Sequence, residues 1–407
     1  MKKEEVFKII LSVMLIVVTL ALLELVSYLS LDEKEKKLPA SAFFSVQHNS
    51  FIEDLDQRTG CSFPRTTVGH SMLGYIHRSN KYLPKSCGMN SNNIGMETTL
   101  DLPLVKNKDE FSIMIMGGSV AHQFSVYKLV NGHNYLSTLL NKLYYPPEGK
   151  KVFRVYTGAA GAWAMPNQVN MLTMYHERID GAIALDGYNE SFPVMDGKRL
   201  EHIPPAQAIL SYSSASSFRF IYLDKLWSYR QYLSRSVLKH SYFFNALYKV
   251  AIGFFRAYII PAETFDEFAD DNREKINLPF EEAKEWALGS FEGYLRKYYL
   301  YGNVLNIKTA HFLQPSRLYG KVLTPEESVA TEFIPVDIYK KINQMYLKLN
   351  KEKLPVYDLT QVFSSEKERI YSDHIHYRTV DGVSRGNELV AEKIAETLGT
   401  AWNLKKR

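Results

Sequence analysis

The chain has 407 residues, with 49 Lys and Arg against 44 Asp and Glu and a formal net charge of +5. This length suits one large domain with insertions, or two domains, and an apolar fraction of 46% can fill a sizeable core. The composition excludes a disordered, collagen-like or disulfide-scaffold protein. The net charge is too small for this length to indicate nucleic-acid binding, so we expect no nucleic-acid partner.

The N-terminus carries a long apolar segment. Residues 9–23 read IILSVMLIVVTLALL, and after Glu24 the apolar run resumes as far as Leu31. Together these are about 23 positions, enough to cross a hydrocarbon core as a helix, although a carboxylate at Glu24 is costly there. The apolar region is longer than that of a signal peptide and shows no small-x-small cleavage site. The sequence therefore favours an uncleaved transmembrane anchor over residues 1–31, with the membrane as partner and the rest of the chain periplasmic or at the cell surface.

The segment after the anchor, residues 32–110, begins with the charged run DEKEKK and then becomes rich in Asn, Gly, Pro and Thr. This pattern predicts a tether followed by an irregular layer on the main domain. Cys61 and Cys87 are the only cysteines. In an oxidising compartment they would form a disulfide that closes a loop of about 26 residues, and the alternative is two unrelated buried thiols.

From residue 111 onward, short apolar segments alternate with helical periodicity. The expected strands are residues 111–116, 151–157, 181–187, 308–315 and 354–359, and the expected helices are residues 135–143, 164–178, 335–350 and 386–399. Strands that alternate with helices predict a parallel sheet covered on both faces. We therefore expect an α/β domain over residues 111–407, a three-layer αβα sandwich with a five-stranded parallel sheet.

Residues 191–305 interrupt this alternation and are expected to form a helical insertion. The segment 218–258 is rich in aromatic and basic residues, whereas 263–292 is rich in acids. One interpretation is two helices that pack by charge complementarity. The others are a lid over an active site and a basic amphipathic surface resting on a bilayer.

Four short motifs stand at the ends of predicted strands or before the last helix. They are Gly117-Gly118-Ser119, Gly158-Ala-Ala-Gly161, Gly187-Tyr188-Asn189-Glu190 and Asp373-His374-Ile375-His376. In an open parallel sheet, ligands bind at the carboxyl ends of the strands, where the first three motifs fall. We therefore expect these residues to share one site.

Each motif carries a chemical role. A glycine turn can present a serine at the start of a helix, and an Asn amide or a backbone N–H can donate to an oxyanion. An Asp and a His three residues apart can meet side by side, as a base and the carboxylate that orients it. His374 and His376 could also form an H-x-H metal pair, but no third or fourth ligand is evident in the sequence, so we predict no metal.

The order of the serine, glycine, asparagine and Asp-x-x-His blocks resembles the SGNH (GDSL-like) hydrolase family. The segments HSMLGYIH (70–77) and NNIGM (92–96) look like those that precede the serine block in its membrane-anchored bacterial members. The resemblance covers roughly residues 60–190 and 306–400. It implies a flavodoxin-like SGNH fold and a hydrolase that needs neither a metal nor an organic cofactor. It also implies a nucleophile, Ser119, a base, His376, its orienter, Asp373, and an oxyanion hole formed by the Ser119 N–H, the Gly161 N–H and the Asn189 amide.

The sequence departs from the family pattern at four points. Tyr156 or Thr157 stands where an asparagine often precedes the glycine block, and Gly386-Asn387, which would open the last helix, comes about five residues late. The serine block reads Gly-Gly-Ser rather than Gly-Asp-Ser, and Tyr377 stands where a proline is usual after the histidine. The departures at Tyr377 and Gly386-Asn387 leave His374 as the second candidate base and His122 as the third.

These observations predict a membrane-anchored extracytoplasmic serine esterase that acts through an acyl-enzyme. The resemblance and the anchor together favour removal of small acyl groups from a cell-envelope glycan. The alternatives are an O-acyltransferase on the same site, a lipid esterase, and a non-catalytic envelope assembly protein on a hydrolase fold.

Overall fold

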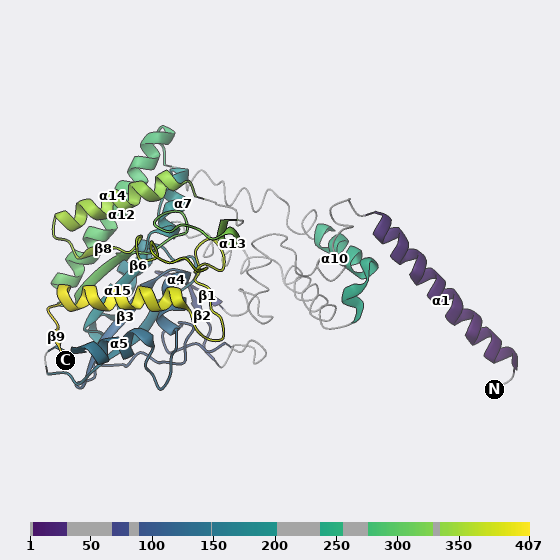
Figure 1. Ribbon diagram of the computed structural model, residues 1–407, viewed down its shortest axis with the longest axis horizontal. Coiled ribbons are helices and arrows are strands. Elements are labelled where there is room, and N and C mark those ends of the chain that lie inside the picture. Colours follow the sequence, from purple (N-terminus) through teal and green to yellow (C-terminus); the bar gives the residue numbers. More distant parts are fainter. Residues whose placement is uncertain are drawn as a thin grey trace. The chain divides into compact units, whose positions relative to one another are not determined.

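The computed structural model of the chain consists of two units (Figure 1). One unit is drawn from residues 1–63 and 211–270, and the other from residues 64–210 and 271–407. The structure describes residues 3–30, 67–80, 89–147, 149–201, 237–254, 276–328 and 334–407.

The first unit contains α1 (Lys3–Leu29), the short 3₁₀ helix η5 (Val237–His240) and α10 (Tyr242–Phe254). The helix predicted at the N-terminus is therefore present. Within the described part of the chain, no helix meets the length and apolarity that a membrane crossing requires. The transmembrane anchor over residues 1–31 stays a prediction. Cys61, Cys87 and residues 31–66 of the tether lie outside the described residues.

Glu24, the acid within the apolar run, contacts the start of α10. Its carboxylate accepts hydrogen bonds from Ser241 Oγ and the Tyr242 N–H, both at 2.6 Å, and from the Phe243 N–H at 3.1 Å. The ring of Tyr28 lies 5.2 Å from that of Tyr242. The first N–H groups of a helix have no partner within that helix. Glu24 therefore caps α10 from another helix, and its own carboxylate is satisfied.

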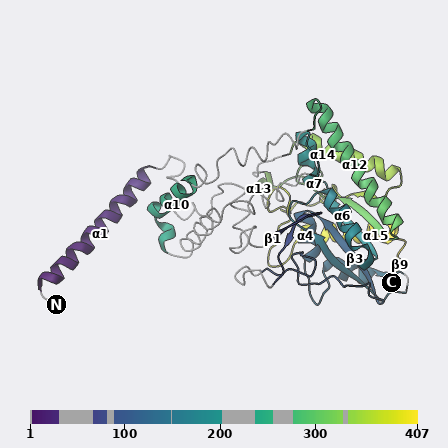
Figure 2. The same ribbon diagram turned by 180° about the vertical axis from the view of Figure 1, so that it is seen from behind.

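The second unit is built on a five-stranded sheet with the order β5-β3-β6-β7-β8, in which every neighbouring pair is parallel (Figures 1 and 2). The five predicted strands are confirmed. Their bounds in chain order are β3 (Glu110–Gly117), β5 (Val152–Ala159), β6 (Gly181–Asp186), β7 (Lys308–Leu313) and β8 (Val356–Asp358).

Helices cover both faces of this sheet. Along β3, the ring of Phe111 lies 6.0 Å from that of Trp402, which follows the last helix, while Met116 contacts the hydroxyl of Tyr298 from the other side. Residues of odd and even number point to opposite faces of a strand, so two helical layers flank the sheet. One layer holds α4 (Ser119–Val126), α5 (Tyr135–Leu143) and α15 (Arg385–Ala401), and the other holds α6 (Met165–Tyr175), α7 (Tyr188–Asp196), α12 (Phe280–Val304) and α14 (Val336–Lys351).

The smaller elements lie around this core. A two-stranded hairpin joins β1 (Thr67–His70) to β2 (Gly74–His77), and β4 (Tyr144–Tyr145) pairs with β9 (Lys405–Lys406). Short helices follow at η4 (His176–Arg178) and α13 (Pro325–Ser328). Residues 67–77 belong to the segment that we expected to be irregular, and they instead form this regular hairpin.

The helix α12 lies inside residues 191–305, where we expected the alternation to stop. It packs against α6, α7 and β7, so it continues the layer on that face of the sheet. Its buried positions recur at helical spacing: Ala283, Ala287, Phe291, Leu295, Tyr298 and Gly302. The many charges between them hide this stripe in the sequence. Residues 202–236 and 255–275 lie outside the described ranges, so a lid or a bilayer surface there stays a prediction.

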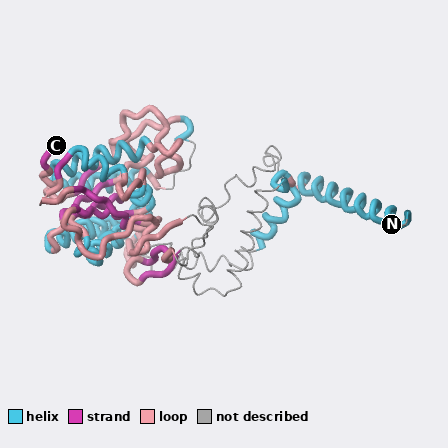
Figure 3. Tube along the Cα trace, turned by 90° about the horizontal axis from the view of Figure 1, so that it is seen from below, coloured by secondary structure: helices cyan, strands magenta, loops and turns pink. Residues whose placement is uncertain are grey.

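The chain order of the strands places a switch point in the middle of the sheet. After β3 the chain passes to β5 on one side of it and then to β6 on the other. Ligands bind outside the carboxyl ends of strands at such a point. The Gly118-Ser119 turn after β3 and the Gly187-Tyr188-Asn189 turn after β6 both lie there. In Figure 3 the strands lie side by side with helices around them.

Candidate active site

The turn that presents Ser119 requires glycine at two positions. Gly117 has φ +143°, and a Cβ there would collide with the carbonyl oxygen of Leu185. A Cβ on Gly118 would collide with the amide nitrogen of Asn189. Ser119 is the first residue of α4, so its N–H is one of those that a helix leaves without an internal partner. The local sequence thus places the hydroxyl, an unused donor and the Asn189 amide together.

Three side chains from the first and fourth motifs form a continuous hydrogen-bonded chain. His376 Nε2 lies 2.7 Å from Ser119 Oγ, and His376 Nδ1 lies 2.8 Å from Asp373 Oδ2. The second carboxylate oxygen of Asp373 accepts from the N–H groups of Ile375 and His376, both at 2.8 Å. This Asx turn explains how residues so close in sequence form a rigid pair.

The environment of Asp373 favours its ionised form. Burial alone would raise its pKa, but the hydrogen bond and charge of His376, with the N–H groups of His376 and Ile375, lower the pKa of Asp373 well below its usual range. The carboxylate is therefore ionised at neutral pH and can hold the imidazole in the tautomer that accepts a proton at Nε2.

This depressed pKa predicts how stability depends on pH. A carboxylate with a lowered folded pKa stabilises the fold above its unfolded pKa, and this contribution disappears as pH falls through the folded value. We expect the difference in unfolding free energy between the parent and Asp373→Asn to be constant above about pH 5 and to shrink below about pH 4. Urea unfolding at a series of pH values measures it, and a difference that grows as pH falls would contradict the assignment.

The Asn189 amide lies against the serine turn, since a Cβ on Gly118 would collide with its nitrogen. Its nitrogen donates to the carbonyl oxygen of Trp163 at 2.7 Å, which orients the amide and leaves the second hydrogen of the same nitrogen for a ligand. In the neighbouring turn, the carbonyl oxygen of Gly161 accepts from the hydroxyl of Tyr75. No hydrogen bond from the Gly161 N–H to another described residue is found. The three expected oxyanion donors therefore belong to turns at one edge of the sheet.

Removal of the Asn189 amide has a specific expected cost. In Asn189→Ala we expect kcat for ester hydrolysis to fall about 10²- to 10³-fold with little change in KM, because an oxyanion donor acts mainly in the transition state. Steady-state kinetics of the purified variant measure this. A rise in KM at unchanged kcat would assign Asn189 to ground-state binding instead.

The other two candidate bases have different partners. The ring of His374 lies 5.5 Å from that of Tyr188 and 6.5 Å from that of His376. His122 Nε2 lies 2.9 Å from the carbonyl oxygen of Glu97. The structure thus brings His376 within hydrogen-bond distance of the Ser119 hydroxyl, whereas His374 lies beside Tyr188 and His122 beside Glu97. Across the described ranges, no cluster of three or more His, Cys, Asp or Glu side chains is arranged to hold a metal.

Sequence reasoning missed two aromatic residues that support the site. Tyr75, on β2, is buried and donates to the Gly161 carbonyl oxygen, and its ring lies 6.0 Å from that of Trp163. Trp163 in turn supplies the carbonyl that orients Asn189. The only signal for this contact was the HSMLGYIH segment, which contains Tyr75.

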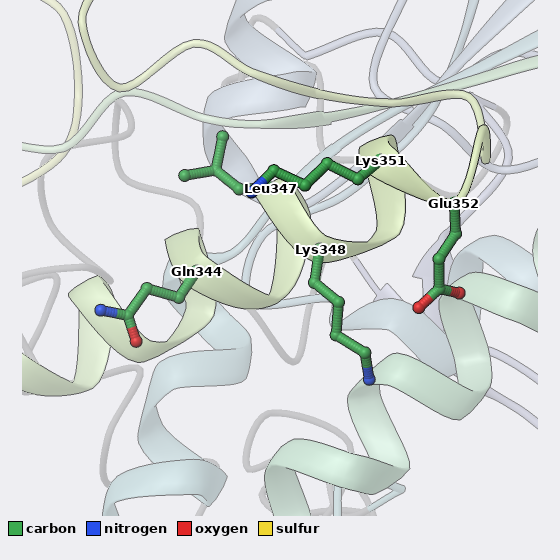
Figure 4. A pocket seen from close by; sticks show the side chains of 5 residues that line it. All are labelled: Gln344, Leu347, Lys348, Lys351 and Glu352. Carbon is green, nitrogen blue, oxygen red and sulfur yellow. The ribbon is translucent and has the colours of Figure 1, made fainter.

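Two surface hollows lie on other parts of the second unit. One is on α14 and the residue after it, where Figure 4 shows Gln344, Leu347, Lys348, Lys351 and Glu352. The amine of Lys348 pairs with Glu292 at 3.1 Å. The other hollow lies at the amino ends of β7 and β8, and its lining includes Lys308, Lys353, Pro355 and Trp402. Neither includes Ser119, Asp373 or His376.

Comparison with known proteins gives a weak similarity. No family model and no curated protein matches the chain. Among solved structures, a candidate acylhydrolase from Bacteroides fragilis NCTC 9343 is 11% identical, with a TM-score of 0.34 over 74% of this chain and 91% of its own. A lipase/acylhydrolase from Enterococcus faecalis is 12% identical, with a TM-score of 0.34 over 73% of this chain and 98% of its own. A similarity of this size identifies neither the reaction nor the substrate of this chain.

Proposed function

We propose that the chain hydrolyses carboxylic esters through an acyl-enzyme on Ser119. The observation that carries this proposal is the hydrogen-bonded series Ser119–His376–Asp373, with distances of 2.7 and 2.8 Å. A hydroxyl is a weak nucleophile until a neighbouring base accepts its proton, and the base needs a group to orient it. All three side chains reach the surface in part, so a substrate can approach them.

The first half of the reaction forms the acyl-enzyme. Ser119 Oγ attacks the ester carbonyl carbon while its proton passes to His376 Nε2. The carbonyl oxygen becomes an oxyanion that the Ser119 N–H, the Gly161 N–H and the Asn189 amide stabilise. The carbon–oxygen bond to the alcohol then breaks, and the alcohol leaves with the proton from His376.

The second half returns the enzyme to its starting state. Water attacks the acyl carbon and gives a proton to His376, which passes it to Ser119 Oγ as the acyl–serine bond breaks. Asp373 stabilises the imidazolium that forms in each half without accepting its proton. The products are a carboxylic acid and an alcohol.

The experiment that tests this function is hydrolysis of p-nitrophenyl esters, acetyl through octanoyl, by the purified chain. We expect release of p-nitrophenol above the uncatalysed rate, greatest for the short esters. Turnover that increases with the length of the acyl group would instead favour a lipid ester as the substrate. A chain that hydrolyses no ester, but transfers an acetyl group to an added glycan, would be an O-acyltransferase on the same residues.

We further propose a location and a substrate class, a small acyl group on a cell-envelope glycan outside the cytoplasm. The apolar run at residues 9–23 supports the membrane location. The carboxylate of Glu24 also fits this location, because it accepts hydrogen bonds, and hydrogen bonding reduces the free-energy cost of a carboxyl group in an apolar phase. We expect the full chain to stay with the membrane fraction after an alkaline carbonate wash. Its recovery in the wash would contradict the anchor.

A further inference from the structure

A buried polar network lies beneath the candidate active site, and the proposed reaction does not use it. It joins Asp186 at the end of β6, Gln168 on α6, His311 on β7 and Tyr346 on α14. These side chains are at most 2% exposed. Polar groups so deeply buried lower stability unless they are paired, so a network of four at this place needs a reason.

The contacts run in one line through the layer on that face of the sheet. Gln168 Nε2 donates to Asp186 Oδ1 at 2.5 Å, and His311 Nε2 lies 3.2 Å from Asp186 Oδ2. On the far side of the ring, His311 Nδ1 lies 2.9 Å from the hydroxyl of Tyr346. His311 Nε2 is also 3.3 Å from the sulfur of Met165. Gln168 on α6 therefore hydrogen-bonds to Asp186 Oδ1, and His311 on β7 lies beside Oδ2, which makes no hydrogen bond within the described residues.

Asp186 touches both turns that build the site. A Cβ placed on Gly117 would lie 3.2 Å from Asp186 Oδ1, so the carboxyl group lies directly against the chain that leads into Ser119. Asp186 also precedes the turn that carries Asn189, and the Gly187 N–H in that turn donates to Glu190 Oε2 at 2.7 Å. A small shift of this carboxyl group would move the serine and the amide relative to each other.

We propose that Asp186 is a positioning residue of the candidate active site, which holds the Ser119 turn and the Asn189 turn in register through its contacts with Gln168 and His311. The inference rests on the proposed ester hydrolysis and names the residue that aligns its nucleophile with its oxyanion donor. It assigns no contact between Asp186 and the substrate.

The charge state of the network fits this role. Burial raises the pKa of Asp186 well above its usual range, against the hydrogen bond from Gln168, and burial lowers the pKa of His311 to about 3. Burial and the nearby Asp186 also raise the pKa of Glu190, and burial raises the pKa values of Tyr298 and Tyr346. Burial thus favours the uncharged forms of Asp186, Glu190 and His311. An Asn side chain has nearly the same shape as Asp and can accept the Gln168 hydrogen bond at its own Oδ1.

The test compares Asp186→Asn with Asp186→Ala in the full chain, measuring kcat, KM, the pH profile of kcat/KM and thermal unfolding. We expect Asp186→Asn to keep kcat within about threefold of the parent and the same pH profile. We expect Asp186→Ala to lower kcat about 10- to 100-fold with KM little changed, the effect of a displacement of about 1 Å between reacting groups. If Asp186→Ala does not fold, Gln168→Met removes one contact at similar volume and should lower kcat in the same way.

Each outcome has a distinct meaning. Full activity in a folded Asp186→Ala, or in Gln168→Met where Asp186→Ala does not fold, would overturn the positioning role. The positioning role would also be overturned if Asp186→Asn were as impaired as Asp186→Ala, or if the acid side of its pH profile of kcat/KM shifted. In either case the charge of Asp186 would matter. A parent chain that hydrolyses no ester would overturn the proposed function itself, and the inference with it.

Discussion

We expect kcat/KM for ester hydrolysis to fall by at least about 10⁴-fold when Ser119 becomes Ala, because Ser119 is the proposed nucleophile of the acyl-enzyme. The hydroxyl is the atom that His376 Nε2 approaches at 2.7 Å, and its loss leaves only the oxyanion donors and substrate binding. Hydrolysis of p-nitrophenyl acetate by the purified variant, with thermal unfolding as a check of folding, measures the loss.

A serine on the same helix provides the matched control. Ser125, also on α4, is buried and bonds to Thr157 Oγ1 at 2.9 Å and to the carbonyl oxygen of His122 at 2.8 Å. Ser125→Ala should lower stability by about 1 kcal/mol and leave turnover close to that of the parent. If Ser119→Ala hydrolysed esters as fast as Ser125→Ala, Ser119 would not be the nucleophile.

The second large effect is expected at His376. Members of a catalytic unit are strongly non-additive, so His376→Ala should lower kcat as far as Ser119→Ala does, and the double variant should be no worse than either. His374→Ala is the control, because that ring lies against Tyr188 and not at the serine hydroxyl. We expect it to keep most of the parent turnover. Steady-state kinetics of these four variants, compared with the parent, decide which histidine is the base.

The opposite pattern of activity in the two histidine variants would identify a different base. If His374→Ala lost activity and His376→Ala kept it, the base would be His374, and the 2.7 Å contact between His376 and Ser119 would have no role in proton transfer. Loss in both variants together with loss of folding would show a structural effect of the whole loop, which thermal unfolding of each variant would reveal.

The strands of the sheet could be predicted from the sequence because each contains a short stretch of mostly apolar residues followed by a turn. Both faces of β6 are buried, so its sequence is apolar from Gly181 to Leu185 without alternation. A helical insertion was predicted over residues 191–305, but the packing of α12 against the sheet was not, since charged residues outnumber the small and aromatic ones that it buries. The buried face of α12 is defined by its contacts with α6 and α7, and the positions of those helices cannot be read from composition.

The candidate site could be predicted as a set of blocks but not as a network. Ser119, Asn189 and the Asp373–His376 pair stand at strand ends or within one turn, where local signals identify them. The partners that orient them come from far along the chain: Tyr75 contacts Gly161, and Gln168 and His311 contact Asp186. Buried polar contacts of this kind depend on tertiary packing, and no spacing in the sequence marks them.

Reaction of the full chain with a fluorophosphonate probe, followed by peptide mass spectrometry, tests most directly whether Ser119 is an activated nucleophile. We expect a single adduct on Ser119 that forms rapidly in the parent and does not form in His376→Ala. An unlabelled Ser119 in a folded parent chain, or an adduct on a different serine, would contradict the proposed acyl-enzyme mechanism.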